Sequence, residues 1–585
     1  MASAKKTSGQ NKPQLQPKAK KVEIPRPWLE HYPPGVSYDG PLEGIALGDL
    51  FDQAVSRYGS KACFDFFGTR TTYAEIGAMT NQLAAGLQKA GVEKGTHIGL
   101  LLPNCPYYSV FYFAILKLGA VVVNFNPLYT KEEIREQVKD SDIEVMVTLD
   151  LKRLFDKVAE LTAEEVIRQL IVCPFTDLLP PIKSILFRLL KSSERANLNK
   201  HKLEEKLLLY PELTDNDGKF KKVEINPEED IALLQYTGGT TGIPKGAMLT
   251  HANLTINCEQ IRRWFTGVKE GEERFLAILP FFHVFAMSCI QNFGFSIGAE
   301  IVLMPKFEIG DTVGAIRRTK PTILPGVPTL YTALLEHKGL KTSDFATLRY
   351  CISGGAPLPH DVRKSFEDFA GCRLVEGYGL SETSPVASIN PFEGLEKENS
   401  IGQPVPGTSI SIRSLDDPSH PVGLRQNGEI CISGPQVMSG YWNKPGETAD
   451  TFTDEYFRTG DVGYMDEHGF VFIVDRIKDM INCSGFKVYP RRVEDAIYEH
   501  PAVAEVTVIG VPDEYRGETP KAFIRLKSGM HASEEDIRAV IEPKLSKIER
   551  PEFIEFRDEL PKTMVGKLSK KELREESENS EPGET

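Results

Sequence analysis

The sequence contains no uninterrupted apolar run of the roughly 18 residues that a membrane-spanning helix requires. Its nine cysteines lie singly, without a Cys-x-x-Cys pair, which argues against a zinc site or a disulfide framework and fits a reducing compartment. Basic residues are in deficit, and the net charge of −13 argues against nucleic acid as a partner. Residues 1–22 lack the apolar core of a secretory signal. We therefore expect a cytoplasmic protein.

The composition that remains is that of a globular enzyme. The chain has 585 residues, enough for several hydrophobic cores, and is 41% hydrophobic and 26% charged. Residues 1–24 are polar and basic, and residues 575–585 are polar and acidic, so we predict a disordered tail at each end.

Strand and helix patterns alternate through residues 45–150. Short apolar runs at 97–102, 120–124 and 144–148 predict strands, and the apolar segment 107–118 predicts a helix. Strands that alternate with helices need crossover connections, so the sequence predicts an α/β fold with a mostly parallel sheet.

The most informative motif is the stretch 237–246, Thr-Gly-Gly-Thr-Thr-Gly-Ile-Pro-Lys-Gly. An apolar run at 231–236 predicts a strand before it, and residues 247–254 predict the start of a helix after it. Glycines let backbone N–H groups approach an anion, threonine hydroxyls add donors and Lys245 adds positive charge. Because Gly246 follows this lysine, the stretch is not the common nucleoside-triphosphate loop. The alternative is a flexible surface turn.

This stretch resembles the phosphate loop of the adenylate-forming family, which includes acyl-CoA synthetases, firefly luciferase and the adenylation domains of peptide synthetases. The family's loop reads Ser/Thr-Ser/Gly-Gly-Thr-Thr-Gly-x-Pro-Lys-Gly, and residues 237–246 fit it throughout. The resemblance implies that the triphosphate of ATP is held by Thr237, Gly238, Gly239, Thr240, Thr241, Gly242 and Lys245. It also implies a large domain of α/β sheets plus a distorted β-barrel over residues 25–475, and a small mobile α+β domain over residues 476–574.

Two further motifs resemble the nucleotide-binding segments of the family. Tyr378 offers an aromatic face for stacking on a base, and Glu382 is an oxygen ligand suited to Mg²⁺. In the family, the residue matching Asp461 accepts the ribose hydroxyls and the residue matching Arg476 contacts the ribose. A solvated loop glutamate and a structural ion pair are the alternatives. The resemblance implies ATP or AMP contacts for Gly355, Ala356, Pro357, Glu376, Gly377, Tyr378, Gly379, Ser381, Asp461, Ile473 and Arg476.

The aromatic segment 281–285 follows a predicted strand at 275–280. A histidine among aromatic residues is often a packed core residue, and this alternative stays open for His283. In the family the segment borders the acyl pocket, so the resemblance implies acyl contacts for Phe282, His283, Met287 and Gly354. Long-chain relatives place a gating tryptophan near the position of Met287, which leaves Met287 and Trp264 as candidates for a gate.

The resemblance continues into the small domain. Residues 475–479 match the family's domain junction, which implies a hinge at Lys478. Helical patterns at 493–500 and 534–547 accompany two strand patterns at 504–511 and 522–526. The family motifs imply CoA contacts for Ser484, Gly485, Phe486 and Lys487. They also imply a mobile catalytic lysine, Lys567, which would act with Glu382, Thr237 and Lys245.

These motifs imply an ATP-dependent acid–thiol ligase that uses ATP, CoA and Mg²⁺ and forms acyl-CoA through an acyl-adenylate. A long-chain or medium-chain fatty acid is the first choice of substrate. An aryl or short-chain acid CoA ligase, and a fatty acyl-AMP ligase acting on a carrier protein, are alternatives. A nucleotide- and lipid-binding scaffold without turnover is an alternative of a different class.

Residues 180–202 form a separate apolar and basic segment. Ile182, Ile185, Leu186, Leu189 and Leu190 fall on one face of a predicted helix, with basic residues beside them. An ordinary docked helix and a helix at the membrane surface both fit this pattern. Together with the basic N-terminal tail, the helix predicts peripheral contact with the inner face of a membrane. A homodimer is a further alternative.

Overall fold

The computed structural model describes residues 25–203, 205–237, 244–513, 515–563 and 568–579. The predicted basic tail at 1–24 lies outside these residues. Residues 575–579, which were predicted to be disordered, instead form the end of helix α17 (Lys570–Asn579). This helix is anchored because Leu573 is buried against the small domain and Arg574 pairs with Asp479 at 2.8 Å.

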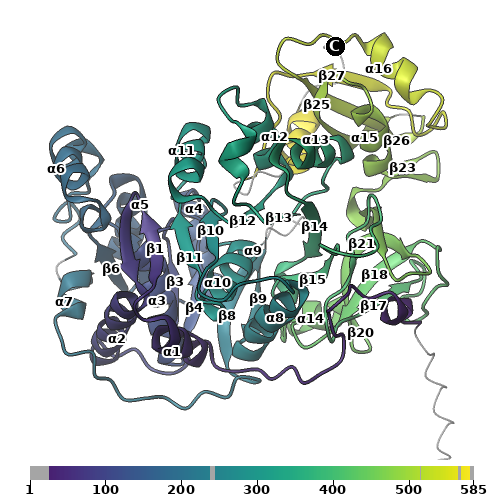
Figure 1. The fold of residues 1–585 in the computed structure, drawn as a ribbon. Helices are drawn as coiled ribbons and strands as arrows, with labels where there is room; N and C mark the ends of the chain where they lie inside the picture. Colours follow the sequence, from purple (N-terminus) through teal and green to yellow (C-terminus); the bar gives the residue numbers. More distant parts are fainter. Residues whose placement is uncertain (1–24, 204, 238–243, 514, 564–567, 580–585) are drawn as a thin grey trace, which may run out of the picture.

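One sheet of the large domain contains the strand that leads into the phosphate motif (Figure 1). Its strand order is β19-β9-β8-β4-β3-β5-β6-β7, and the strands from β8 to β7 are parallel. The bounds are β3 His97–Leu100, β4 Val121–Asn124, β5 Val145–Leu149, β6 Gln169–Cys173, β7 Leu207–Leu209, β8 Ile231–Thr237, β9 Lys245–Thr250 and β19 Gly440–Tyr441. The fully buried runs of β3, β4 and β5 are typical of parallel strands covered on both faces.

A second sheet of the large domain has the order β16-β15-β14-β13-β12-β10-β11-β1-β2, and its central strands are parallel. The bounds are β1 Ala62–Phe66, β2 Thr69–Thr72, β10 Arg274–Ala277, β11 Glu300–Leu303, β12 Ile323–Gly326, β13 Tyr350–Gly354, β14 Leu374–Gly379, β15 Val386–Ile389 and β16 Gln403–Pro404. Strands β13 and β14 end side by side, so the residues that follow them meet at one edge of the sheet.

The two sheets share one hydrophobic core. Helix α3 (Pro106–Lys117) is buried along nearly its whole length, and its core includes Val122 of the first sheet and Phe275 of the second. Buried hydrogen bonds fix its rotation, since Ser109 donates to Gln291 at 2.5 Å. The other principal helices of the large domain are α1 Leu47–Tyr58, α2 Tyr73–Lys89, α4 Lys131–Ser141, α5 Lys152–Ala163, α6 Pro181–Leu190, α7 Tyr210–Thr214, α8 His251–Trp264, α9 Val284–Ala286, α10 Phe293–Ser296, α11 Ile309–Thr319, α12 Pro328–Glu336, α13 His360–Ala370 and α14 Pro445–Thr451.

An antiparallel sheet completes the large domain, and the small domain follows it (Figure 1). The antiparallel strands are β17 Ser409–Arg413, β18 Gly428–Ser433, β20 Phe452–Thr453, β21 Tyr456–Met465 and β22 Val471–Arg476. The small domain contains β23 Ile481–Cys483, β24 Phe486–Val488, β25 Val503–Asp513, β26 Gly517–Leu526, β27 Phe553–Phe556, α15 Pro490–Tyr498, α16 Glu534–Ile541 and α17. The prediction of a large α/β domain with a small α+β domain is confirmed.

The segment after the phosphate motif differs from the prediction. Residues 247–250 were expected to open a helix, but they belong to β9, which pairs antiparallel with β8 from Thr237 opposite Lys245 to Ile231 opposite Thr250. Helix α8 begins only at His251, because the Thr250 side chain caps it by accepting from the backbone N–H of Asn253 at 3.1 Å. The motif is therefore the connection of a β-hairpin.

The described part of the chain contains no helix with the length and apolar character needed to cross a bilayer.

Candidate active site

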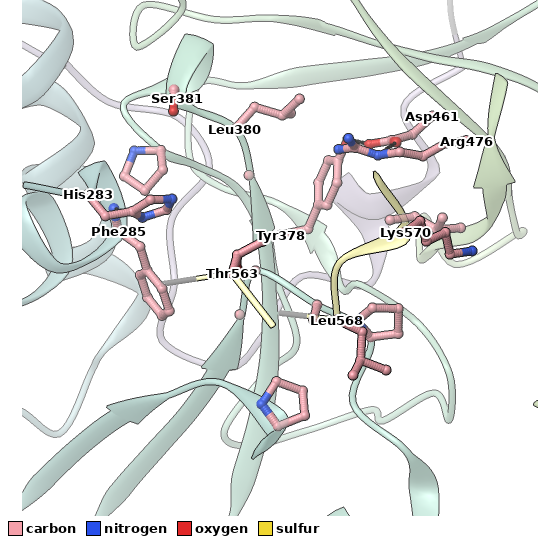
Figure 2. Close-up of a pocket in the computed structure, with 18 of the residues that line it drawn as sticks. His283, Phe285, Tyr378, Leu380, Ser381, Asp461, Arg476, Thr563, Leu568 and Lys570 are labelled. Carbon is pink, nitrogen blue, oxygen red and sulfur yellow. Dashed lines mark hydrogen bonds and ion pairs between the residues drawn. The ribbon is translucent and has the colours of Figure 1, made fainter. Parts of the chain in front are cut away.

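A cavity of about 2310 Å³ lies where the large and small domains meet, and residues of both domains line it. Figure 2 shows side chains from the aromatic segment, from β14 and from β21–β22 converging on this space, with the small-domain residues Thr563 and Leu568 beside them. The predicted site residues on its wall are Thr237, Lys245, Phe282, His283, Gly354, Gly355, Ala356, Pro357, Glu376, Gly377, Tyr378, Gly379, Ser381, Glu382, Asp461, Ile473, Arg476 and Lys478.

Of the remaining predicted residues, Met287 lies in the core, and the others fall into two groups. Gly238, Gly239, Thr240, Thr241, Gly242 and Lys567 lie outside the described residues. Residues 484–487 lie at and beside the turn between β23 and β24, apart from the cavity wall, and the Phe486 side chain is 61% exposed. The structure therefore separates the predicted CoA-binding turn from the predicted nucleotide site.

Close packing and backbone conformation restrict the residue type at the ends of β13 and β14. A Cβ atom added to Gly354 would lie 3.1 Å from a ring carbon of Phe285, and one added to Gly379 would lie 1.8 Å from the Pro385 carbonyl oxygen. Gly355 has a φ of +82°, a conformation that favours glycine. Side chains at these positions would collide with their neighbours, so the two strand ends require glycine.

Tyr378, Asp461 and Arg476 form a hydrogen-bonded group on one wall of the cavity (Figure 2). The Tyr378 hydroxyl donates to Oδ2 of Asp461 at 2.5 Å, and Arg476 Nε lies 2.8 Å from Oδ1. Asp461 and Arg476 face each other as register partners of β21 and β22. Burial and the Asp461 charge raise the pKa of Tyr378, so its hydroxyl keeps its proton and holds the carboxylate in place.

A second group joins Lys245 to Glu382 through Tyr441. The Tyr441 hydroxyl donates to Oε1 of Glu382 at 2.8 Å, and Lys245 Nζ lies 5.3 Å from the centre of the Tyr441 ring. Lys245 also forms an ion pair with Glu447. Burial raises the pKa of Glu382. Among the described residues, Lys245 and Arg476 form their ion pairs with Glu447 and Asp461 and not with Glu382. A buried carboxylate of this kind would gain from a bound cation.

The other end of the cavity is apolar. Ile261, Phe265, Phe285, Cys289 and Phe293 line it, next to His283. His283 caps α9, since its Nδ1 accepts from the backbone N–H of Phe285 at 3.3 Å.

Neither candidate for a gate lines the cavity. Met287 begins a π-helical turn, η4 (Met287–Asn292), and lies in the core, where its sulfur is 3.8 Å from Asn124 Nδ2. Trp264 is also buried and packs edge-on against Tyr32. The wider turn of the π-helix places Cys289, and not Met287, on the cavity wall.

The small domain contacts the large domain beside the cavity. The backbone N–H of Arg491 in α15 donates to Asp475 at the end of β22, at 2.8 Å. Within the small domain, Lys570 lies 2.8 Å from Glu494 of α15. Burial raises the pKa of Asp475 to about 6 and that of Glu376 to about 7, while nearby Arg491 opposes the shift at Glu376. Burial and the neighbouring Arg476 charge lower the pKa of Lys478, the predicted hinge residue, to about 8.

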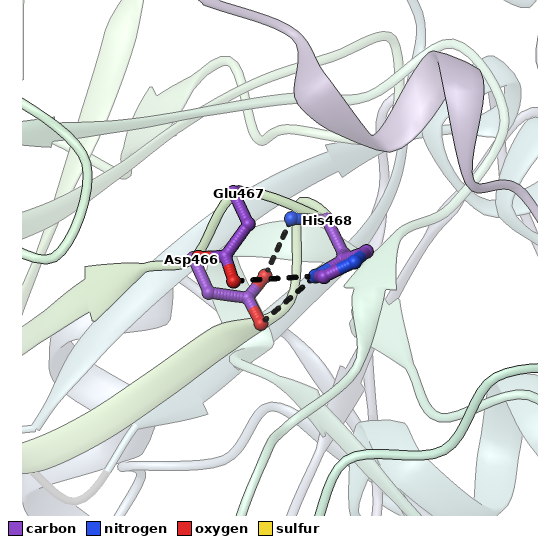
Figure 3. Close-up of side chains that lie close together, drawn as sticks. All are labelled: Asp466, Glu467 and His468. Atoms are coloured by element: carbon purple, nitrogen blue, oxygen red, sulfur yellow. Dashed lines mark hydrogen bonds and ion pairs between the residues drawn. The ribbon is translucent and has the colours of Figure 1, made fainter.

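A cluster outside the cavity, Asp466, Glu467 and His468, brings two carboxylates and an imidazole together (Figure 3). Asp466 accepts from the backbone N–H groups of His468 and Phe470, each at 2.9 Å, and Glu467 pairs with Arg425 at 2.7 Å. These bonds shape the turn between β21 and β22. The cluster therefore fits a structural role.

Several residues that line the cavity or pair with its lining residues escaped the sequence analysis. Tyr441, Glu447 and Arg491 are distant in sequence from the family motifs that they approach, and an isolated tyrosine or ion pair gives no pattern. The apolar residues Phe265 and Phe293 also line the cavity. The aromatic run around 281–285 pointed to this region, but a helical period does not reveal a π-helical turn.

Comparisons with known proteins agree with this geometry. A family model described as AMP-binding enzyme matches residues 51–442, and a model described as AMP-binding enzyme C-terminal domain matches residues 492–567. The long-chain-fatty-acid–CoA ligase of Bacillus subtilis is 42% identical over 95% of this chain and 99% of its own length. The enzyme of the same name from Escherichia coli O157:H7 is 36% identical, over 94% and 98%.

A solved structure gives the same picture of the fold. The ATP-bound crystal structure of MatB from Rhodopseudomonas palustris superposes with a TM-score of 0.79 at 27% identity, covering 91% of this chain and 99% of that one. The family models and the full-length relatives show that the chain belongs to the AMP-binding enzymes, the adenylate-forming family that its motifs resemble.

Proposed function

We propose that the protein is an ATP-dependent ligase that joins a long-chain fatty acid to CoA through an acyl-adenylate, releasing pyrophosphate and AMP. The observation that supports this proposal most directly is that one cavity is lined by polar residues, including Tyr378 and Asp461, and by apolar residues, including Phe285 and Phe293. The relatives named as ligases of long-chain fatty acids support the same choice of acid.

The polar end would hold the nucleotide. The Tyr378 ring offers a face for the adenine beside the glycines of β13. The Asp461 carboxylate, held by Tyr378 and Arg476, has lone pairs suited to accept the two ribose hydroxyls. Because these groups are fixed before ligand arrives, little ordering accompanies binding.

In the first half-reaction, a carboxylate oxygen of the fatty acid bonds to the α-phosphorus of ATP. The bond from that phosphorus to the bridging oxygen breaks, and pyrophosphate leaves with the electron pair. Two anions must meet, so the site has to offset negative charge. Lys245 lies on the cavity wall, and we assign the same task to Lys567, because Thr563 and Leu568 on either side of it line the cavity.

Glu382 is the residue that would hold Mg²⁺. Its carboxylate is buried, accepts one hydrogen bond from Tyr441 and has a raised pKa, features that fit a cation ligand. When bound, Mg²⁺ would offset charge on the phosphates and the leaving pyrophosphate. Tyr441 orients the glutamate through its hydroxyl, and Lys245 lies over the ring of the same tyrosine.

In the second half-reaction, the CoA sulfur bonds to the acyl carbon as its proton passes to solvent, and the bond from that carbon to the phosphate oxygen breaks to release AMP. Residues 484–487 lie away from the cavity in this arrangement, which therefore suits the first half-reaction. We propose that the small domain turns about Lys478 to bring these residues to the acyl-adenylate.

The test is CoA-dependent AMP formation with straight-chain acids from acetate to stearate and with aryl acids. We expect kcat/KM to rise with chain length into the long-chain range, because each added methylene buries apolar surface. A maximum with aryl or short acids would overturn the long-chain assignment. Acyl transfer to a carrier protein but not to CoA, with release of AMP, would favour a fatty acyl-AMP ligase. Absence of ATP–pyrophosphate exchange with every acid would overturn the reaction itself.

A further inference from the structure

Helix α6 leaves an apolar face uncovered by the described part of the chain. Ile182, Ile185, Leu186, Leu189 and Leu190 are between 48% and 76% exposed. Their spacing puts all five on one face. Large apolar side chains gathered on ten residues are unusual for a surface that only meets water, so this face fits a binding partner.

The opposite side of α6 attaches it to the large domain. The Phe187 ring packs 5.3 Å from that of Phe175, and Arg188 donates to the Thr176 hydroxyl at 3.0 Å. Ser184 and Phe187 are the half-buried residues of the helix. These contacts hold α6 in one orientation, with its apolar face pointing outward.

Positive charge surrounds this face on a protein of net negative charge. Residues 180–202 contain six Lys or Arg residues and one Glu, a formal charge of +5, whereas the whole chain carries −13. Three carboxylates outside this segment pair with its cations, so the local charge with them counted is +2 and stays positive; the pairs are Arg188–Asp177, Arg195–Asp150 and Lys200–Asp156. Lys183 Nζ lies 5.0 Å over the ring of Phe67, which is itself 38% exposed at the turn between β1 and β2. Cations beside an exposed apolar face complement an anionic lipid surface.

Neither the small domain nor a second copy of the chain suits this face as well. Figure 1 shows α6 at the left edge of the molecule and the small domain at the right, and no α6 residue lines the cavity. A stable interface between copies buries about 800 Å² on each partner. Helix α6 is about 15 Å long and 10 Å wide, and two faces with positive surroundings would repel.

We propose that α6 docks the protein on an anionic phospholipid bilayer, with the five apolar residues in the interface and Lys183 toward the headgroups. The inference goes beyond the proposed function, because neither half-reaction requires a membrane. Only the advantage of docking depends on the proposed function, because a bilayer concentrates the long-chain acid that the enzyme would use. Docking through α6 leaves the small domain, which lies at the opposite side in Figure 1, free to move, and no α6 residue lines the cavity.

The test is flotation of the full chain with vesicles of phosphatidylcholine and with vesicles of equal parts phosphatidylcholine and phosphatidylglycerol. We expect the wild type to float with the mixed vesicles, with less binding at high salt. The double variant Leu189→Glu/Leu190→Glu should lower the bound fraction by about tenfold or more. Leu424→Glu, at an exposed leucine outside α6, is the matched control and should bind as the wild type does.

Two further measurements separate the outcomes. CoA-dependent AMP formation from a water-soluble acid without vesicles should be unchanged in the double variant. This result would show that the double variant is folded. It would also test the ligase assignment separately from membrane docking. Failure of the wild type to float with either vesicle would overturn the proposal. So would equal loss in the Leu424 control. A wild-type dimer in light scattering that the double variant converts to monomer would assign the face to a second copy instead.

Discussion

The Tyr441 hydroxyl donates a 2.8 Å hydrogen bond to Oε1 of Glu382, which lies 59 residues earlier in the chain. The Tyr441 backbone is part of β19, and β19 pairs with β9, the strand that starts at Lys245. One tyrosine therefore connects the candidate metal ligand to the strand that leaves the phosphate motif. We expect Tyr441 to act as a positioning residue for Glu382.

The variant Tyr441→Phe should lower the rate of ATP–pyrophosphate exchange by about tenfold, because a hydrogen bond to a carboxylate contributes about 1.5 kcal/mol. The loss should shrink as Mg²⁺ is raised, since the defect lies in the orientation of its ligand. Tyr515→Phe, at a tyrosine that is 93% exposed, serves as the control. An unchanged Mg²⁺ dependence would argue against the positioning role.

The variant Asp461→Asn should weaken ATP binding by about tenfold to a hundredfold, as measured by calorimetry. The amide can still accept from Tyr378, but it loses the charge that faces Arg476 and strengthens hydrogen bonds from hydroxyl groups. Asp416→Asn, at an exposed position, is the control. If Asp461→Asn bound ATP as tightly as the wild type, the carboxylate would be a structural partner of Arg476 alone.

The two half-reactions should fail separately. Lys567→Ala should lower pyrophosphate release by about a hundredfold or more, yet still convert supplied acyl-adenylate to acyl-CoA. Gly485→Leu should do the reverse, because Gly485 has a φ of +82° and a leucine there would strain the predicted CoA-binding turn. Equal loss of both steps in both variants would contradict a small domain with two functional faces.

Glu376 should make stability depend on pH. Burial raises its pKa from 4.5 to about 7 in the folded protein, so the folded state binds more protons than the unfolded state between these values. Its contribution to the free energy of unfolding is thus full below about pH 4.5 and falls as pH rises to 7, by up to about 3 kcal/mol.

Glu376→Gln should therefore match the wild-type melting temperature at pH 5 and exceed it at pH 8, in scans without nucleotide. The exposed Glu393→Gln variant should match the wild type at both pH values. A lower melting temperature for Glu376→Gln at pH 8 would show that the charged form of Glu376 stabilises the fold, through Arg491.

Sequence patterns predicted the alternation of strands and helices well, because buried parallel strands are short, wholly buried and mostly apolar, as β3 and β4 show. Helix caps are local as well: the Thr72 side chain accepts from the backbone N–H of Glu75 at the start of α2. The second strand of the hairpin, β9, was missed, because the apolar residues at 247 and 249 fit a strand as well as a helix. Only pairing with β8 decides between them.

The residues of the candidate site also divide into those that the sequence could predict and those that it could not. Motif residues such as Tyr378 and Asp461 could be named in advance, since family motifs mark them, and the structure brings them within hydrogen-bond distance. Tyr441 could not be named, because its role comes from β19 pairing with β9. The position of Met287 depended on the hydrogen-bond pattern of one π-helical turn, which side-chain chemistry does not encode.

The pairing of Thr237 with Lys245 has a consequence for how the phosphate motif can change. These residues close the hairpin at its base, so the sheet fixes both ends of residues 238–243, whatever lies between them. The family resemblance implies that this span binds the triphosphate, so substitutions inside it should change nucleotide affinity while the strands on either side keep their register. Nucleotide affinity and fold stability would then be adjusted independently, which gives selection or a protein engineer a short segment to vary at little structural risk.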